Sequence, residues 1–310
     1  MVNGQEVKTT NGSCSPNGTD IKKQQEDAAK LKATLPDLQR TVDDRGISIN
    51  RVGVEDIDFL LTITNKQGDK IPVQAKIDMF TSLRHQVKGI NMSRFLDVLM
   101  EWKDEVLTDQ GVEKLLRQLW EKMGPKDVED TYIKIKFKYF LHKMTPVSKL
   151  DCVVAHDCFF IGVLRNNNFH MNVGAEVLVT TNCPCSKAIS KYGAHGQRSR
   201  CTVIIRELLK KRFWLEDLIA LIEKQGSCEI YPLLKRVDEK YVTEKAYENP
   251  KFVEDVSRDI AIALQETNLI RKFRIKVKNE ESIHHHDATA YVARKLWGST
   301  WVKDQAFGII

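Results

Sequence analysis

Alternating apolar and polar positions dominate the chain after residue 46 and predict β-strands. In the first half, such runs are rich in β-branched and aromatic residues, and they lie at 47–54, 57–64, 71–83, 130–144 and 150–165. The segment KQGDK at 66–70 has the composition of a hairpin turn. Between the third and fourth runs, apolar residues recur three and four positions apart and predict helices over 92–107 and 110–124.

The same order of patterns returns in the second half. Strand patterns at 169–181 and 201–207 precede helical patterns at 214–224 and 250–266, and strand patterns at 269–278 and 288–297 follow. The runs IKIKFK (133–138) and FRIKVK (273–278) both alternate apolar with basic residues. We therefore predict an α+β protein in which a ββααββ unit is used twice, each unit an antiparallel sheet with its helix pair on one side. The basic strand faces are either solvated or line a wet tunnel between sheets.

The chain divides into three predicted parts. The first 35 residues are polar, glycine-rich and without apolar periodicity, which predicts a disordered arm over 1–35. A first unit is expected over 36–166. The second unit, with the candidate catalytic motifs, is expected over 167–310.

Composition narrows the class of protein. Hydrophobic residues make up 42% of the 310 positions, enough for a real core. The net charge of +6 favours anionic ligands but is too small to indicate nucleic acid as a partner. No apolar run approaches the roughly 18 residues that span a bilayer, so no membrane partner is expected. The seven cysteines, an odd number without a secretion signal, predict reduced thiols and a cytoplasmic location.

The densest chemistry lies in TTNCPCSKAISKYGAHGQRS, residues 180–199. A disulfide between Cys183 and Cys185 would close a small, strained ring. A structural zinc site usually needs a second paired arm, which the sequence lacks. Cys183 and His195 instead suit an open catalytic metal site, completed by a carboxylate from elsewhere. The plainer interpretation, a buried cysteine and a turn histidine, remains open.

Two further segments are candidates for chemistry. SIHHHDATA (282–290) offers either a metal-binding patch or a single acid–base histidine before the last strand. The segment 233–259 is crowded with acids, most of which are expected to be surface charges paired with lysines. Spacing alone does not choose among Asp238, Glu239, Glu244, Glu254 and Asp255.

Four motifs in this order resemble the type IB GTP cyclohydrolases: GINMSRFL, CPCSKAISKYGAHGQRS, ENPKFVEDVSRD and ESIHHHDATA. The resemblance covers roughly residues 36–300. It implies a bimodular tunnelling fold, and an enzyme that hydrolyses cyclic-amidine C–N bonds of GTP. Attack at purine C8 would give formate and 7,8-dihydroneopterin triphosphate, the first step of folate biosynthesis. It also implies a homo-oligomer, expected to be a tetramer, with active sites at subunit interfaces.

The resemblance further implies roles for individual residues. Cys183, His195 and Glu239 match metal ligands, for Zn²⁺ or Mn²⁺ with Fe²⁺ as an alternative. Glu254 matches the residue that anchors guanine, a task that suits a carboxylate because it accepts two parallel hydrogen bonds. His284 matches an acid–base histidine, so the expected catalytic set is Cys183, His195 and His284.

The resemblance leaves two further points: the residues that bind the triphosphate, and the positions at which the chain differs from the family pattern. The triphosphate needs cations, and the basic residues near the motifs are Arg94 (next to Ser93), Lys187, Lys191 and Arg198. The chain departs from the family pattern at Asn91, Asn182 and Gly196, where many members carry histidine, a small or apolar residue, and asparagine. These departures concern the shape of the pocket more than the reaction.

Three alternatives stay open. A relative with the same fold would yield a cyclic-phosphate product with Fe²⁺, and a nitrile reductase would use Cys183 as a nucleophile with NADPH. A non-catalytic purine- or RNA-binding module would use the lysine-rich strands as its surface, although the aromatic stacking pattern of such modules is missing.

Overall fold

The computed structural model describes residues 36–207 and 213–295, together with the isolated positions Lys23 and Asp27. The predicted disordered arm over 1–35 therefore lies outside the described residues, apart from those two positions. Short segments of the second unit, 208–212 and 296–310, lie outside them as well.

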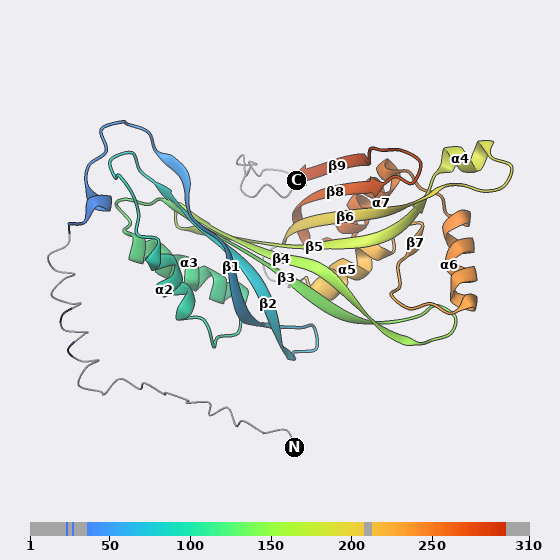
Figure 1. Cartoon of the computed structure of the whole chain (residues 1–310), viewed down its shortest axis with the longest axis horizontal. Helices are drawn as coiled ribbons and strands as arrows, with labels where there is room; N and C mark the ends of the chain where they lie inside the picture. Colours follow the sequence, from blue (N-terminus) through green and yellow to red (C-terminus); the bar gives the residue numbers. More distant parts are fainter. Residues whose placement is uncertain (1–22, 24–26, 28–35, 208–212, 296–310) are drawn as a thin grey trace, which may run out of the picture.

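A single antiparallel sheet runs through the whole molecule (Figure 1). Its order is β1-β2-β3-β4-β5-β6-β8-β9, and the short β7 pairs with β5 beside this path. The strands are β1 (Ile49–Thr64), β2 (Lys70–Leu83), β3 (Asp130–Met144), β4 (Asp151–Arg165), β5 (Asn168–Asn182), β6 (Gly196–Glu207), β7 (Cys228–Glu229), β8 (Ile270–Glu280) and β9 (Ala288–Lys295).

The two predicted ββααββ units meet at a tight hairpin between β4 and β5. Arg165 pairs with Asn168, and both turn residues between them, Asn166 and Asn167, have positive φ. Asparagine tolerates this backbone region, and two such residues form the turn whose twist matches that of the flanking strands. The sheets of the two units are therefore continuous.

The structure describes six helices, most of which cover one face of the sheet with apolar side chains. They are α2 (Ser93–Met100), α3 (Asp109–Met123), α4 (Pro184–Ile189), α5 (Leu215–Glu223), α6 (Arg236–Glu248) and α7 (Val253–Glu266), after a short 3-10 turn at Leu38–Arg40. The helical stripes predicted from the sequence are the buried faces. Fully buried members include Val112, Leu116 and Leu119 on α3, and Val256, Ile260 and Leu264 on α7.

These helical residues form one core with alternate residues of the strands, such as Ile133 and Ile135 on β3. Burying each large aliphatic side chain stabilises the fold by roughly 1.5–3 kcal/mol. The predicted fold class is confirmed, with helices packed on one side of an antiparallel sheet.

The structure differs from the predicted elements in several places. The helix predicted over 92–107 ends at Met100, and the short elements α4 and β7 were not predicted. The predicted strands at 47–54 and 57–64 are one strand, β1, with an irregularity between Val54 and Ile57 where Asp56 has positive φ. The second unit has a helix, α6, that the predicted helix pair lacked. Of its residues only Asp238 and Ala246 are buried, so α6 has no apolar stripe for periodicity to detect.

The opposite face of the sheet is mixed in character. A second apolar cluster there contains Tyr132, Phe159, Ile161, Val163 and Ile204. Two of the basic strand residues beside it have acidic partners: Lys138 pairs with Asp157 at 2.7 Å, and Lys278 with Asp287 at 2.7 Å. Burial, reinforced by neighbouring Lys136, lowers the pKa of Lys134 to about 8. The basic alternation is thus partly compensated by charge within the chain.

Candidate active site

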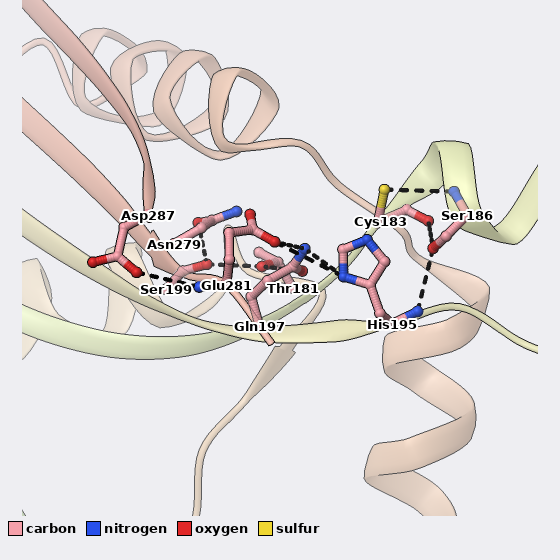
Figure 2. A network of polar contacts seen from close by, with 9 residues as sticks. All are labelled: Thr181, Cys183, Ser186, His195, Gln197, Ser199, Asn279, Glu281 and Asp287. Atoms are coloured by element: carbon pink, nitrogen blue, oxygen red, sulfur yellow. Dashed lines mark hydrogen bonds and ion pairs between the residues drawn. The ribbon is translucent and has the colours of Figure 1, made fainter. Parts of the chain in front are cut away.

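Three neighbouring strands, β5, β6 and β8, change from apolar to polar residues where they end at the same side of the sheet. Figure 2 shows the polar side chains. Taken towards that side of the sheet, the core-facing residues of the strands are Val177, Val179 and Thr181 on β5, Val203, Cys201, Ser199 and Gln197 on β6, and Ile275, Val277 and Asn279 on β8. The next residues in the three series are Cys183, His195 and Glu281, respectively. Because side chains alternate along a strand, these three residues extend the same face beyond the core.

A buried hydrogen-bond ladder joins the polar positions. Thr181 Oγ1 lies 2.8 Å from Ser199 Oγ, which donates to Asn279 Oδ1 at 2.6 Å. Because the Ser199 proton goes to Asn279, Thr181 Oγ1 donates its one proton to Ser199 Oγ, and Gln197 Oε1 lies 3.3 Å from Thr181 Oγ1. All four residues are less than 10% exposed. Buried polar groups that are satisfied in this way rigidify their surroundings, so the ladder gives the site a fixed base.

Backbone hydrogen bonds bring Cys183 and His195 together. The Cys183 N–H donates to the His195 carbonyl at 3.1 Å, which closes the loop between β5 and β6. Ser186 Oγ accepts from the His195 N–H at 3.2 Å and donates to the Cys183 carbonyl at 3.1 Å. Cys183 is the N-cap of α4, with Pro184 at the first helical position, and its side chain is half-buried. The two predicted metal ligands of the motif are therefore neighbours.

The orientation of the His195 ring is set by two residues to which the sequence analysis gave no role, although both lie in the quoted motifs. Its Nδ1 lies 3.1 Å from Gln197 Nε2 and 3.9 Å from Glu281 Oε2. Gln197 Nε2 in turn donates to Glu281 Oε2 at 3.1 Å. Figure 2 shows the other ring nitrogen, Nε2, on the side facing Cys183. The period of two along β6 and β8 was the signal that could have revealed both residues.

Glu239 lies apart from this pair. It is exposed in the first turn of α6, where neighbouring Asp238 accepts hydrogen bonds from the β3–β4 turn. The other end of α6 reaches the site: Lys187 Nζ donates to the Tyr247 carbonyl at 2.5 Å. Tyr247 is about two helical turns, or about 12 Å, from Glu239 along the helix axis.

Within the part of one chain that the structure describes, no three His, Cys, Asp or Glu side chains are grouped to hold a metal ion. The role of Glu239 as third ligand stays a prediction. The donor chemistry of Cys183 and His195 fits a divalent ion.

The other predicted residues of the second unit surround the site on exposed elements. Glu254 is exposed in the first turn of α7, and Arg198 is exposed on β6. His284 is exposed in the loop between β8 and β9, where its ring stacks on that of His286 with centroids 5.1 Å apart. Lys187 is half-buried and also lies over the Tyr247 ring. Their contacts with substrate stay predictions.

Ser93 and Arg94 are at the opposite end of the molecule. They begin α2 in the first unit, whereas Cys183 begins α4 at the far end of the second (Figure 1). Arg94 Nη1 donates to the Lys122 carbonyl at 3.0 Å, at the C-terminal end of α3. One chain therefore does not bring Arg94 to the Cys183 site.

Two of the departures from the family pattern prove to be a single feature. Asn182 and Gly196 are directly opposed in the pairing of β5 with β6. A Cβ atom added at Gly196 would lie 2.9 Å from the Asn182 side-chain amide, too close for real structures. With its amide oriented to satisfy both ends, Asn182 donates to the Thr181 carbonyl and accepts from the Tyr247 N–H. The glycine thus leaves room for the asparagine.

Comparisons with known proteins identify the family of the chain. A family profile described as type I GTP cyclohydrolase folE2 matches residues 35–290. The chain is 41% identical to GTP cyclohydrolase FolE2 of Nitrosococcus oceani, over 86% of this chain and 97% of that protein. It is 42% identical to GTP cyclohydrolase FolE2 of Geobacter metallireducens, over 84% and 97%.

Among solved structures, urate oxidase from Bacillus sp. TB-90 aligns with a TM-score of 0.50 and 8% identity, over 80% of this chain and all of that one. This likeness concerns the fold alone. The resemblance read from the four motifs is confirmed by the sequence comparisons, and the chain belongs to the type I GTP cyclohydrolase folE2 family.

Proposed function

We propose that this chain is a metal-dependent GTP cyclohydrolase of type IB. It hydrolyses GTP at purine C8 to formate and 7,8-dihydroneopterin triphosphate, the first step of folate biosynthesis. The observation that carries the proposal is the adjacency of Cys183 and His195 at the ends of neighbouring strands, within a chain of this family.

The metal would be held by the Cys183 thiolate and by Nε2 of His195, with Zn²⁺, Mn²⁺ or Fe²⁺ as the ion. Such an ion with an open position lowers the pKa of water toward 7 and so supplies a nucleophile at neutral pH. His195 suits the task because its Nδ1 side is occupied by Gln197 and Glu281, which leaves Nε2 toward Cys183.

The substrate would be bound by residues around this pair. The Glu254 carboxylate accepts from guanine N1–H and from the 2-amino group, which fixes the base. His284 moves protons during ring opening and reclosure, as an imidazole does near neutral pH. Lys187 and Arg198 meet the triphosphate. All four side chains come from elements that border the strand ends.

We also propose that the working enzyme is a homotetramer with active sites between subunits. Two observations support this. Arg94 and Ser93 are at the far end of the chain from Cys183, and Glu239 faces solvent about two helical turns from the site. A second copy would bring both groups within reach. The end strands β1 and β9 are the edges at which copies would join, and joining protects edges from aggregation.

A cytoplasmic location belongs to the same proposal. The described cysteines are all free thiols, which suits a reducing compartment. Over residues 36–207 and 213–295, no helix combines the length and apolar character needed to cross a membrane.

The test is a metal-stripped protein reconstituted separately with Zn²⁺, Mn²⁺ and Fe²⁺ and supplied with GTP. We expect formate release, a product that becomes a fluorescent pterin on oxidation, and the mass of a linear triphosphate. A cyclic-phosphate mass would identify the related enzyme instead. Absence of any product with all three metals would refute the proposal.

Variants separate the metal ligands from other cysteines. Cys183→Ala and His195→Ala should each lose metal retention and activity together. The matched control is Cys152→Ser, because Cys152 lies on β4 away from the site and its thiol donates to the Lys143 carbonyl, a bond that serine retains. An active, metal-free Cys183→Ala protein would contradict the ligand role.

A further inference from the structure

We propose that Glu281 and Gln197 are positioning residues for His195, and that Glu281 stabilises the form of the ring able to bind a metal. The inference rests on the proposed metal-binding role of His195. It concerns two residues to which the motifs gave no task, and it says how they act on the ring.

Burying the Glu281 carboxylate costs free energy of desolvation. Its side chain is only 10% exposed, just past the end of β8. A carboxylate removed from water must be compensated by hydrogen bonds or opposite charge. Its compensating groups are the Gln197 amide at 3.1 Å and the His195 ring at 3.9 Å. The Gln197 amide and the Glu281 carboxylate lie on the side of the His195 ring away from Cys183. This position suits a supporting group rather than a metal ligand.

The loop does not need this carboxylate for its anchorage. The Glu281 backbone N–H donates to Asp287 Oδ1 at 3.3 Å, and the other Asp287 oxygen pairs with Lys278 at 2.7 Å. These contacts fasten the start of the loop to β8 and leave the Glu281 side chain free for another task. Its removal should therefore leave the loop in place.

The Glu281 carboxylate fixes the direction of the Gln197 amide. A carboxylate oxygen can only accept, so Gln197 Nε2 donates to Glu281 Oε2 at 3.1 Å, and the same NH₂ group faces His195 Nδ1. A ring nitrogen that accepts from this NH₂ carries no proton. In this arrangement the single proton of the neutral ring is on Nε2, the nitrogen on the Cys183 side.

Metal binding requires the other arrangement. A neutral imidazole that ligates through Nε2 carries its proton on Nδ1, and that proton needs an acceptor. Glu281 Oε2 is 3.9 Å from Nδ1, so a closure of about 1 Å gives a charge-assisted hydrogen bond of about 2.9 Å. The ring has one proton in both arrangements. Glu281 thus favours the ligating tautomer and holds the ring at the required angle.

The chain provides a matched control one residue away. Glu280 lies on the opposite face of β8 and pairs with Arg200 at 3.1 Å. Glu280→Gln therefore removes the same charge from the same strand end without touching His195. Glu281→Gln keeps the shape of the side chain and an oxygen for Gln197, but removes the anionic acceptor.

The experiment compares Zn²⁺ affinity of the full chain, measured by competition with a chromophoric chelator, in wild type and both variants. Loss of a supporting group of this kind typically costs 10–100-fold in metal affinity, so we expect about that loss in Glu281→Gln. Glu280→Gln should bind as wild type does. Two-bond ¹H–¹⁵N spectra of the His195 ring should show Nε2–H without metal and Nδ1–H with Zn²⁺ in wild type.

Gln197→Ala removes the NH₂ donor to Nδ1. The metal-free ring should then show Nδ1–H in the same spectra, because Glu281 is left as the acceptor beside that nitrogen. Wild-type affinity in Glu281→Gln would overturn the inference, as would Nδ1–H in the metal-free wild type or Nε2–H in metal-free Gln197→Ala. Failure of the proposed function gives a different result, because wild type would then bind Zn²⁺ no more tightly than Cys183→Ala.

Discussion

The close approach of Gly196 to Asn182 predicts a measurable coupling between the two positions. Gly196→Ala adds a Cβ atom 2.9 Å from the end of the Asn182 side chain, whereas the next atom, the Thr181 carbonyl oxygen, is at an ordinary 3.6 Å. The asparagine must therefore shift. It would give up its place between the Thr181 carbonyl and the Tyr247 N–H.

The magnitude follows from opposing effects. Glycine within a strand destabilises by roughly 0.5–1 kcal/mol relative to alanine, so Gly196→Ala gains that much where there is room. Overpacking typically costs about 1–3 kcal/mol, and the low end applies because Gly196 is exposed and the obstructing atom ends a side chain. When Gly196→Ala is made in the wild-type protein, the gain and the cost nearly cancel. When it is made in Asn182→Ala, only the gain in free energy of unfolding remains. The two positions are therefore coupled by about 1 kcal/mol.

The assay is equilibrium urea unfolding of four proteins: wild type, Gly196→Ala, Asn182→Ala and the double variant, at one protein concentration. Asn182→Ala alone should lose about 0.5–1.5 kcal/mol with its hydrogen bonds. Adding Gly196→Ala should then recover roughly 0.5–1 kcal/mol. Effects that add to within about 0.3 kcal/mol would refute the reasoning, because uncoupled positions behave in that way.

Three further predictions concern buried charges and thiols. Burial raises the pKa of Asp238, but hydroxyl and amide donors of the β3–β4 turn outweigh it and hold that pKa well below its usual range. The stabilisation is present above the unfolded-state value of about 3.9 and is lost as pH falls below it. Wild type should therefore lose more thermal stability than Asp238→Asn between about pH 5 and pH 3, and parallel curves would contradict this. Lys143 pairs at 2.7 Å with Glu223, both side chains being 15% exposed. Lys143→Met should lower the free energy of unfolding in urea by about 3–5 kcal/mol, because it leaves the buried Glu223 charge without a partner. A double variant that also carries Glu223→Leu should recover most of this loss. Equal losses in the single and double variants would argue against the buried charge as the cause. Burial raises the pKa of Cys201 to about 12, whereas Cys185 is exposed. Peptide mapping after brief alkylation of the native protein should find Cys185 modified and Cys201 protected, and early modification of Cys201 would contradict the buried thiol.

Local patterns were sufficient wherever an element buries one face. β3 was predicted over 130–144 and occupies those residues, because alternation of side chains is a property of the strand itself. The stripe on α3 likewise predicted its buried face. α6 escaped prediction for the opposite reason, since it is held by contacts of its ends and buries almost no apolar surface.

The active-site pair was within reach of the sequence because Cys183 and His195 bound one short connection between paired strands. Spacing along twelve residues suffices to bring them together once β5 and β6 pair. Their resemblance to family motifs then supplied the chemistry, and the sequence comparisons confirmed the family.

The supporting residues depended on the tertiary structure. Glu281 meets His195 only because β8, from a distant part of the chain, pairs with β6 and ends at the same edge. The fold also separates residues that the motifs suggested would act together, with Arg94 and Cys183 at opposite ends of one chain. The sequence by itself determined the elements, the core faces and the chemical types of the site residues, because these follow from local periodicity and residue chemistry. Strand pairing between distant parts of the chain decided which of those residues meet. Local periodicity does not specify that pairing, so the sequence pattern could not predict it.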